Sequence, residues 1–132
     1  MIRNCYDLQM GRVIHFEINV DQPEKSADFY SEVFDWVISK KESDTSDYWL
    51  VHTGRQDLKG INGGLKKTHL NTKGIIPTVG IENLAETMKK IEKSGGKILS
   101  PRTALPATGY LAYCSDPEGN VFALLEYDSD AE

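Results

Sequence analysis

His15 and Glu17 are the residues whose types and spacing best suit chemistry. They lie two positions apart in a stretch that alternates polar and apolar residues, so a strand over 13–20 places both on one face. Imidazole has an ordinary pKa near neutrality, and a carboxylate beside it can orient the ring or accept a substrate proton. The alternative for each is structural: a hydrogen-bonded histidine inside the fold, and a carboxylate paired with a neighbouring strand.

The elements that must position this pair begin with a strand and a helix. The sequence predicts a helix that starts near Pro23, with Asp21 as its cap and Glu24 as the capping-box partner. Pro23 suits the first turn because the N–H group that it lacks would be unpaired there. The Gly-bounded segment 61–65 is expected to be a hairpin return or an edge strand. The strands predicted in this half are 13–20, 36–39, 48–53 and 61–65, with the helix ending near Asp35.

The second half repeats this order. Asn83 and Glu86 form another capping-box pattern at the start of a predicted helix. Gly95 and Gly96 are expected to end that helix, because glycine readily adopts the left-handed conformation found at helix C-termini. We expect Pro77 to break the first strand early, and the loop 103–109 to form a lip of the site. The strands predicted in this half are 75–81, 97–99, 110–114 and 121–127.

Two copies of a strand-helix-strand-strand-strand order indicate an α+β fold. A repeat this short cannot bury its own sheet face, so the two βαβββ modules are expected to pair into one cleft-forming domain. Module one covers about 11–66 and module two about 74–127, within a single domain of residues 1–132.

Composition excludes several classes of protein. The chain has 132 residues, 39% of them hydrophobic, which predicts a globular domain with one core. A net charge of −5 without a basic cluster disfavours nucleic acid as a partner. No apolar run approaches the roughly 18 residues of a membrane span, and no signal peptide is evident, so we expect no membrane association and a cytoplasmic location. Cys5 and Cys114 lie far apart and are expected to be free thiols.

Several motifs resemble the vicinal-oxygen-chelate superfamily, which includes glyoxalase I, bleomycin- and fosfomycin-resistance proteins and extradiol dioxygenases. The resemblance covers about residues 11–127 and implies paired βαβββ modules, a small organic ligand or substrate, and commonly a homodimer. The motifs are HFEI at 15–18, FY at 29–30, VFDW at 33–36, SGGKI at 94–98 and DPEGNVF at 116–122.

Metal-dependent members of that superfamily ligate a divalent cation with four residues. Carried over to this chain, those positions fall on His15, about Leu50, about Ile76 and Ala123. Only His15 has a donor side chain, whereas a hard divalent cation needs three or more oxygen or nitrogen donors. We therefore expect no metal at the family position and no other cofactor.

A displaced metal site is the alternative. Glu17 shares a face with His15, and His52 shares one with Leu50, so His15, Glu17 and His52 are candidates to converge. Glu126 has the opposite parity to Ala123 and is expected to point away from the cleft.

Aromatic residues on the predicted strands favour binding of a flat organic molecule. An apolar, aromatic lining with a few polar groups is typical of such sites, although any single ring is more often part of a core. The predicted ligand contacts are Tyr48, Leu50, His52, Tyr110 and Ala123, with His15 and Glu17 as the predicted catalytic residues.

Three functions remain compatible with the sequence. The first is binding of a small organic molecule in an apolar cleft without the family metal. The second is a glyoxalase-like lyase or isomerase that uses a displaced metal site or a His15/Glu17 proton-transfer pair. The third is a non-catalytic structural or interaction module whose interior is packed shut.

Overall fold

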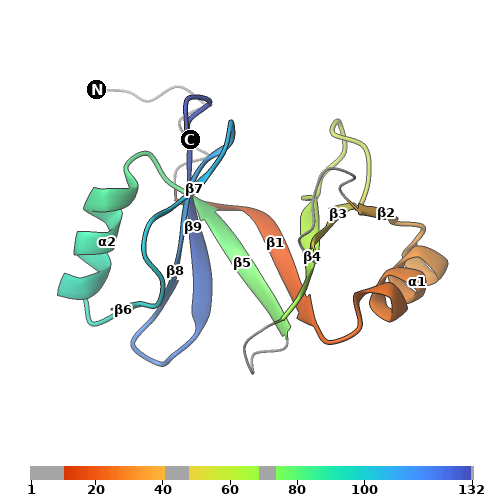
Figure 1. The fold of residues 1–132 in the computed structure, drawn as a ribbon, viewed down its shortest axis with the longest axis horizontal. Coiled ribbons are helices and arrows are strands. Elements are labelled where there is room, and N and C mark those ends of the chain that lie inside the picture. Colours follow the sequence, from red (N-terminus) through yellow and green to blue (C-terminus); the bar gives the residue numbers. More distant parts are fainter. Residues whose placement is uncertain (1–10, 41–47, 69–73, 132) are drawn as a thin grey trace. The chain divides into compact units, whose positions relative to one another are not determined.

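A computed structural model describes residues 11–40, 48–68 and 74–131 (Figure 1). The chain divides into two compact units. The N-terminal unit is His15–Ile76, and the C-terminal unit combines residues 11–14 with residues 77–131. That residues 1–132 form a single domain stays a prediction.

The N-terminal unit contains one helix and a sheet in the order β2-β3-β4-β1. Strand β4 runs antiparallel to β3 and parallel to β1, so it lies between them. The expectation that 61–65 forms an edge strand is therefore wrong, whereas its role as the return strand of a hairpin is confirmed. The elements are β1 (Arg12–Val20), α1 (Pro23–Phe34), β2 (Val37–Lys40), β3 (Tyr48–His52) and β4 (Gly63–Lys67).

The apolar face of β1 packs beneath α1. Its side chains Phe16, Ile18 and Val20 join a core built around Trp49 and Leu65, which are buried. Since successive strand residues point to opposite sides, the polar residues of β1 occupy the other face. The alternation predicted for 13–20 is thus confirmed.

The ends of α1 agree with the sequence only in part. The helix begins at Pro23, and Asp35 stops it in the left-handed conformation with φ 60°. The cap residue is Gln22, and no side chain makes a capping hydrogen bond there. The capping box predicted for Asp21 and Glu24 is therefore wrong, because the helix starts one residue later than such a box requires.

The C-terminal unit has the sheet order β5-β9-β8-β6, with β7 paired to β8. Two expectations are wrong here: Pro77 does not break β5, and part of the loop 103–109 forms a strand. Pro77 is tolerated because pairing with β9 begins one residue later, at Thr78. The elements are β5 (Gly74–Gly80), α2 (Leu84–Lys93), β6 (Lys97–Ile98), β7 (Thr103–Leu105), β8 (Gly109–Ser115) and β9 (Val121–Tyr127).

Both units follow the order expected of an α+β fold. Each has a strand, a helix and then further strands, so the βαβββ order is confirmed, with β7 as an addition in the C-terminal unit. Neither α1 nor α2, the helices of the described chain, is long and apolar enough to cross a membrane.

The core of the C-terminal unit lies between α2 and its sheet. It is built around Leu84, Ala112, Cys114 and Leu124. Cys114 is a free thiol, as predicted, and its burial raises the pKa of that thiol. Cys5 lies outside the described residues.

Asn83 caps α2, as the sequence predicted. Its side-chain oxygen accepts a hydrogen bond from the backbone N–H of Glu86 at 3.0 Å. We expect Asn83→Ala to lower the free energy of unfolding by about 1 kcal/mol, because this N–H loses its partner. Urea denaturation measures the change, and Asn83→Asp serves as the control that keeps the cap. An equal loss in both variants would contradict the capping role.

Candidate functional site

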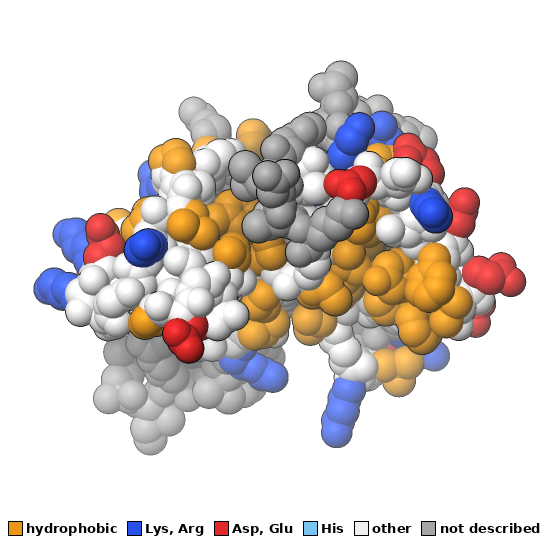
Figure 2. Space-filling view, turned by 90° about the horizontal axis from the view of Figure 1, so that it is seen from below, with side chains coloured by type: hydrophobic (Ala, Val, Ile, Leu, Met, Phe, Trp, Pro, Cys, Tyr) orange, Lys and Arg blue, Asp and Glu red, His pale blue; other side chains and the backbone are white. Residues whose placement is uncertain are grey.

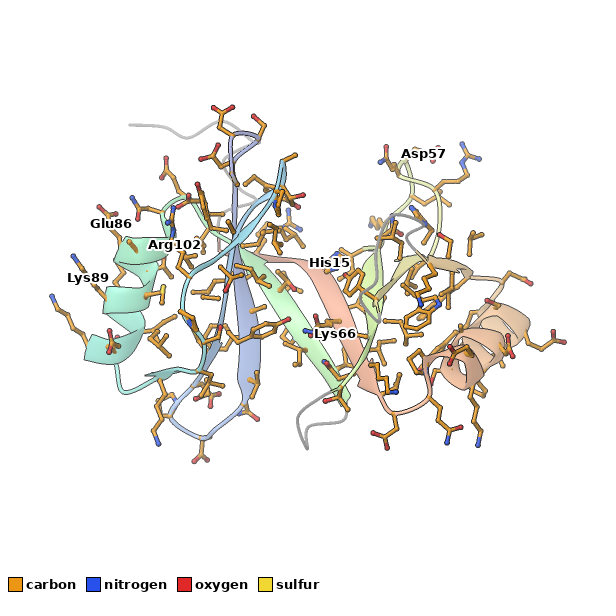
Figure 3. The ribbon with its side chains drawn as sticks, viewed as in Figure 1. His15, Asp57, Lys66, Glu86, Lys89 and Arg102 are labelled. Carbon is orange, nitrogen blue, oxygen red and sulfur yellow. The ribbon has the colours of Figure 1, made fainter. Side chains whose placement is uncertain are left out.

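The face of the N-terminal sheet opposite α1 carries a cluster of polar side chains, here called the polar face. Figure 3 labels His15 and Lys66 on this side of the unit. The strand register places Glu17, Gly64 and Leu50 in one row across the sheet. It places Asn19, Lys66 and Tyr48 in the next row.

His15 and Tyr48 are joined directly. The Nε2 atom of His15 lies 3.2 Å from the phenol oxygen of Tyr48. Burial lowers the pKa of His15 and outweighs the opposing effect of Glu17. Burial, with a further contribution from Glu17, raises the pKa of Tyr48 to about 12. Both side chains are therefore neutral at neutral pH, and either the phenol O–H donates to Nε2 or an Nε2–H donates to the phenol oxygen.

Gly64 makes this hydrogen bond possible. A Cβ atom at Gly64 would overlap the phenol group of Tyr48, so the tyrosine ring crosses β4 where the strand has no side chain. From the sequence, the segment 61–65 that contains Gly64 is expected only to be a hairpin return or an edge strand. A glycine in a strand often marks close approach by another group, which is the signal that was available.

Glu17 is held by a neighbour on its own strand. Its Oε2 atom accepts a hydrogen bond from Nδ2 of Asn19 at 3.1 Å. Both residues are buried, with 8% and 7% of their surfaces exposed. Because burying a polar group is costly unless it is hydrogen-bonded, this contact with Asn19 offsets part of the cost of burying the Glu17 side chain. Alternation places Asn19 on this face, although Asn19 is not among the site residues predicted from the sequence.

Leu50 and His52 lie on the same face of β3 as Tyr48. Leu50 is 38% exposed and His52 is also exposed. The sequence thus correctly grouped His15, Glu17, Tyr48 and these two residues on one side of the N-terminal sheet.

Tyr110 and Ala123 belong to the C-terminal unit and do not share a face. Ala123 pairs with Tyr113, whereas Tyr110 pairs with Glu126. Tyr110 packs toward the core under α2, and the guanidinium of Arg102 lies 3.6 Å from its ring centre. The prediction that Tyr110 and Ala123 line the same site is therefore wrong, because their side chains point to opposite faces of the sheet.

Glu126 points to the helix side of its sheet, as its parity predicted. Its Oε1 atom accepts a hydrogen bond from the backbone N–H of Leu84 at 2.8 Å, at the start of α2. This carboxylate therefore satisfies one of the unpaired donors at the N-terminus of a helix, where negative charge is also favourable.

Comparison with known families matches nearly the whole chain. The family model described as the Glyoxalase/Bleomycin resistance protein/Dioxygenase superfamily matches residues 12–124. The chain belongs to this glyoxalase superfamily. The resemblance that the motifs indicated is thereby confirmed.

Two curated members of the glyoxalase superfamily are similar over most of their length. A "Probable lactoylglutathione lyase" of Vibrio parahaemolyticus is 26% identical, covering 88% of this chain and 91% of the relative. A protein of the same name from Synechocystis is 25% identical, covering 89% of this chain and 96% of the relative. A solved variant of Streptomyces coelicolor methylmalonyl-CoA epimerase, in complex with 2-nitronate-propionyl-CoA, shares the fold. Its TM-score is 0.65 at 12% identity, covering 93% of this chain and 99% of the epimerase.

Within residues 11–40, 48–68 and 74–131, the side chains do not supply a set of donors that fits a metal ion. Leu50 and Ala123, onto which the resemblance carries two of the family's ligand positions, have no donor atoms in their side chains. The Nε2 atom of His15 already bonds to Tyr48. In the part of the chain that the structure describes, no three His, Cys, Asp or Glu side chains converge as ligands, and this includes His15, Glu17 and His52.

Proposed function

We propose that the protein binds a small organic molecule on the polar face, with His15, Glu17 and Tyr48 as its polar contacts and without a metal ion. The observation that carries this proposal is the hydrogen bond between His15 and Tyr48, which places two neutral polar groups side by side on this face. Tyr110 and Ala123 are not part of the proposal.

The polar face offers a mixed set of recognition groups. Tyr48 and His15 are neutral, so each can exchange its present hydrogen bond for one to a hydroxyl or carbonyl group of a ligand. Glu17 adds an acceptor, and Leu50 supplies apolar surface next to it. A few polar groups beside apolar surface are typical of sites for small organic ligands.

Ligand-observed NMR on EDTA-treated protein tests the proposal. The probes are a library of small aromatic carbonyl and hydroxyl compounds. We expect hits whose dissociation constants rise about ten-fold in Tyr48→Phe, because one hydrogen bond of about 1.4 kcal/mol is lost. The control is Tyr127→Phe, which removes an exposed phenol from β9.

Two results would overturn the proposal. One is a set of hits that bind Tyr48→Phe and the parent equally. The other is tight stoichiometric binding of Ni²⁺, Zn²⁺ or Mn²⁺ with gain of lyase activity.

A lyase or isomerase is the second candidate. It is favoured by the neutral His15 close to Glu17, a pair suited to proton transfer, and by the names of the two curated relatives. An activity assay with the hemithioacetal of methylglyoxal and glutathione tests it, using His15→Ala and Glu17→Gln. Unchanged turnover in both variants removes this candidate. A lack of both ligands and turnover would favour a non-catalytic interaction module.

A further inference from the structure

Lys66 places a positive charge on the polar face. It follows Gly64 by two residues on β4, and the strand register pairs it with Asn19 on one side and with Tyr48 on the other. Paired residues of neighbouring strands project to the same side of a sheet, so these three side chains form one row. Figure 3 labels Lys66 and His15 on the same side of the sheet.

The Lys66 side chain is only partly exposed. A lysine can bury its aliphatic part and keep its ammonium group at a polar surface. A partly buried charge is screened less by water and salt than a fully exposed one, so it attracts an anion more strongly. Lys66 already interacts with another group of the protein. Because an ammonium group has three N–H donors, it can hold a ligand anion in addition to that partner.

The α1 side of the same sheet offers a different surface. Lys67, the next residue of β4, points to that side because successive strand residues face opposite ways, and it is exposed. Phe29 and Phe34 are more than half exposed on α1, and Figure 2 shows apolar side chains gathered over the part of the molecule that carries this helix. Only Lys66 of the two lysines therefore combines partial burial with polar neighbours.

Glu17 decides where on the polar face a negative group can lie. The phenol group of Tyr48 crosses Gly64, which is paired with Glu17, so the phenol reaches the row of this carboxylate. The charge of Glu17 acts on both Tyr48 and His15. An anionic ligand group beside that pair would be repelled, whereas a neutral hydroxyl or carbonyl group would not. The anionic group therefore belongs at Lys66, one row away.

The spacing of the two rows sets the length of the ligand. Lys66 lies two residues beyond Gly64, which corresponds to about 7 Å along a strand. One benzene ring with substituents at opposite ends spans a comparable length. A carboxylate carries a single negative charge and so matches one ammonium group, whereas a phosphate dianion next to Glu17 would leave excess negative charge.

We propose that the ligand of the polar face is a small organic carboxylate whose charged group binds Lys66 and whose hydroxyl or carbonyl group meets His15 and Tyr48. This inference rests on the proposed function and adds to it a charge for the ligand and a residue that selects for that charge.

Two probes that differ in charge but hardly in shape test the inference. They are para-hydroxybenzoate and para-hydroxybenzamide, titrated by ligand-observed NMR into EDTA-treated protein at neutral pH. We expect the benzoate to bind at least about ten-fold more tightly, because a hydrogen bond to a charged group is stronger than one to a neutral group. Lys66→Met should remove this preference and Lys66→Arg should keep most of it. The control Lys67→Met should leave it unchanged.

Equal binding of the two probes to the parent protein overturns the inference, and so does a preference that survives Lys66→Met. In both cases a dissociation constant that still rises in Tyr48→Phe supports the polar face as the binding site, so the proposed function is judged separately. If neither probe binds, the inference also fails, and the neutral compounds of the library decide the proposed function. Circular dichroism checks that each variant folds, and Lys66→Gln replaces Lys66→Met if the latter does not.

Discussion

Gly64→Ala is expected to lower the free energy of unfolding by about 1–3 kcal/mol, a typical cost of overpacking, and to break the hydrogen bond between His15 and Tyr48. The added Cβ would overlap the phenol group, so the tyrosine ring must leave β4 or the strands must separate. Urea denaturation measures the stability, and NMR of the His15 ring nitrogens reports whether Nε2 still has its partner.

Two controls identify the cause of this loss. Gly54→Ala adds the same methyl group where nothing lies within 4 Å, so it should change stability by less than about 1 kcal/mol. When Tyr48→Ala is already present, adding Gly64→Ala should leave the free energy of unfolding almost unchanged, because the ring that the new Cβ would overlap is absent. If Gly64→Ala lowers the free energy of unfolding as much with Tyr48→Ala as without it, then Gly64 is required by the backbone conformation and not by Tyr48.

The second large effect is a loss of stability in alkali that depends on Tyr48. The pKa of Tyr48 is raised from 10.0 to about 12 in the folded protein. Below pH 10 the phenol is protonated in both folded and unfolded chains, and the neutral folded form keeps its full contribution. Between pH 10 and 12 the unfolded chain ionises first, so stability falls by up to about 3 kcal/mol.

Denaturation between pH 8 and pH 11.5 measures this loss, and absorbance at 295 nm follows the ionisation. Tyr48→Phe should make the decline in stability less steep and remove the phenol ionisation assigned to a pKa of about 12. Tyr127→Phe, at an exposed position, should leave both signals in place. A decline that is equally steep in the parent and in Tyr48→Phe would contradict the assignment.

Local patterns in the sequence predicted much of the fold. Alternation over 13–20 correctly placed His15 and Glu17 on the face opposite the apolar residues, and β9 has the predicted bounds 121–127. These predictions succeed because the period of a strand depends on residues that are neighbours in the chain.

Other features of the candidate site depend on contacts between distant segments. The approach of Tyr48 to His15 requires the register of β3 on β4 and of β4 on β1, together with the missing side chain of Gly64. Tyr110 was grouped with Ala123 because the sequence does not state how β8 aligns with β9. A shift of one residue moves every side chain of a strand to the other face. The sequence by itself therefore determined which residues alternate and where most elements begin. Only the tertiary structure decided which side chains meet, because strand register is set by pairing between segments far apart in the chain.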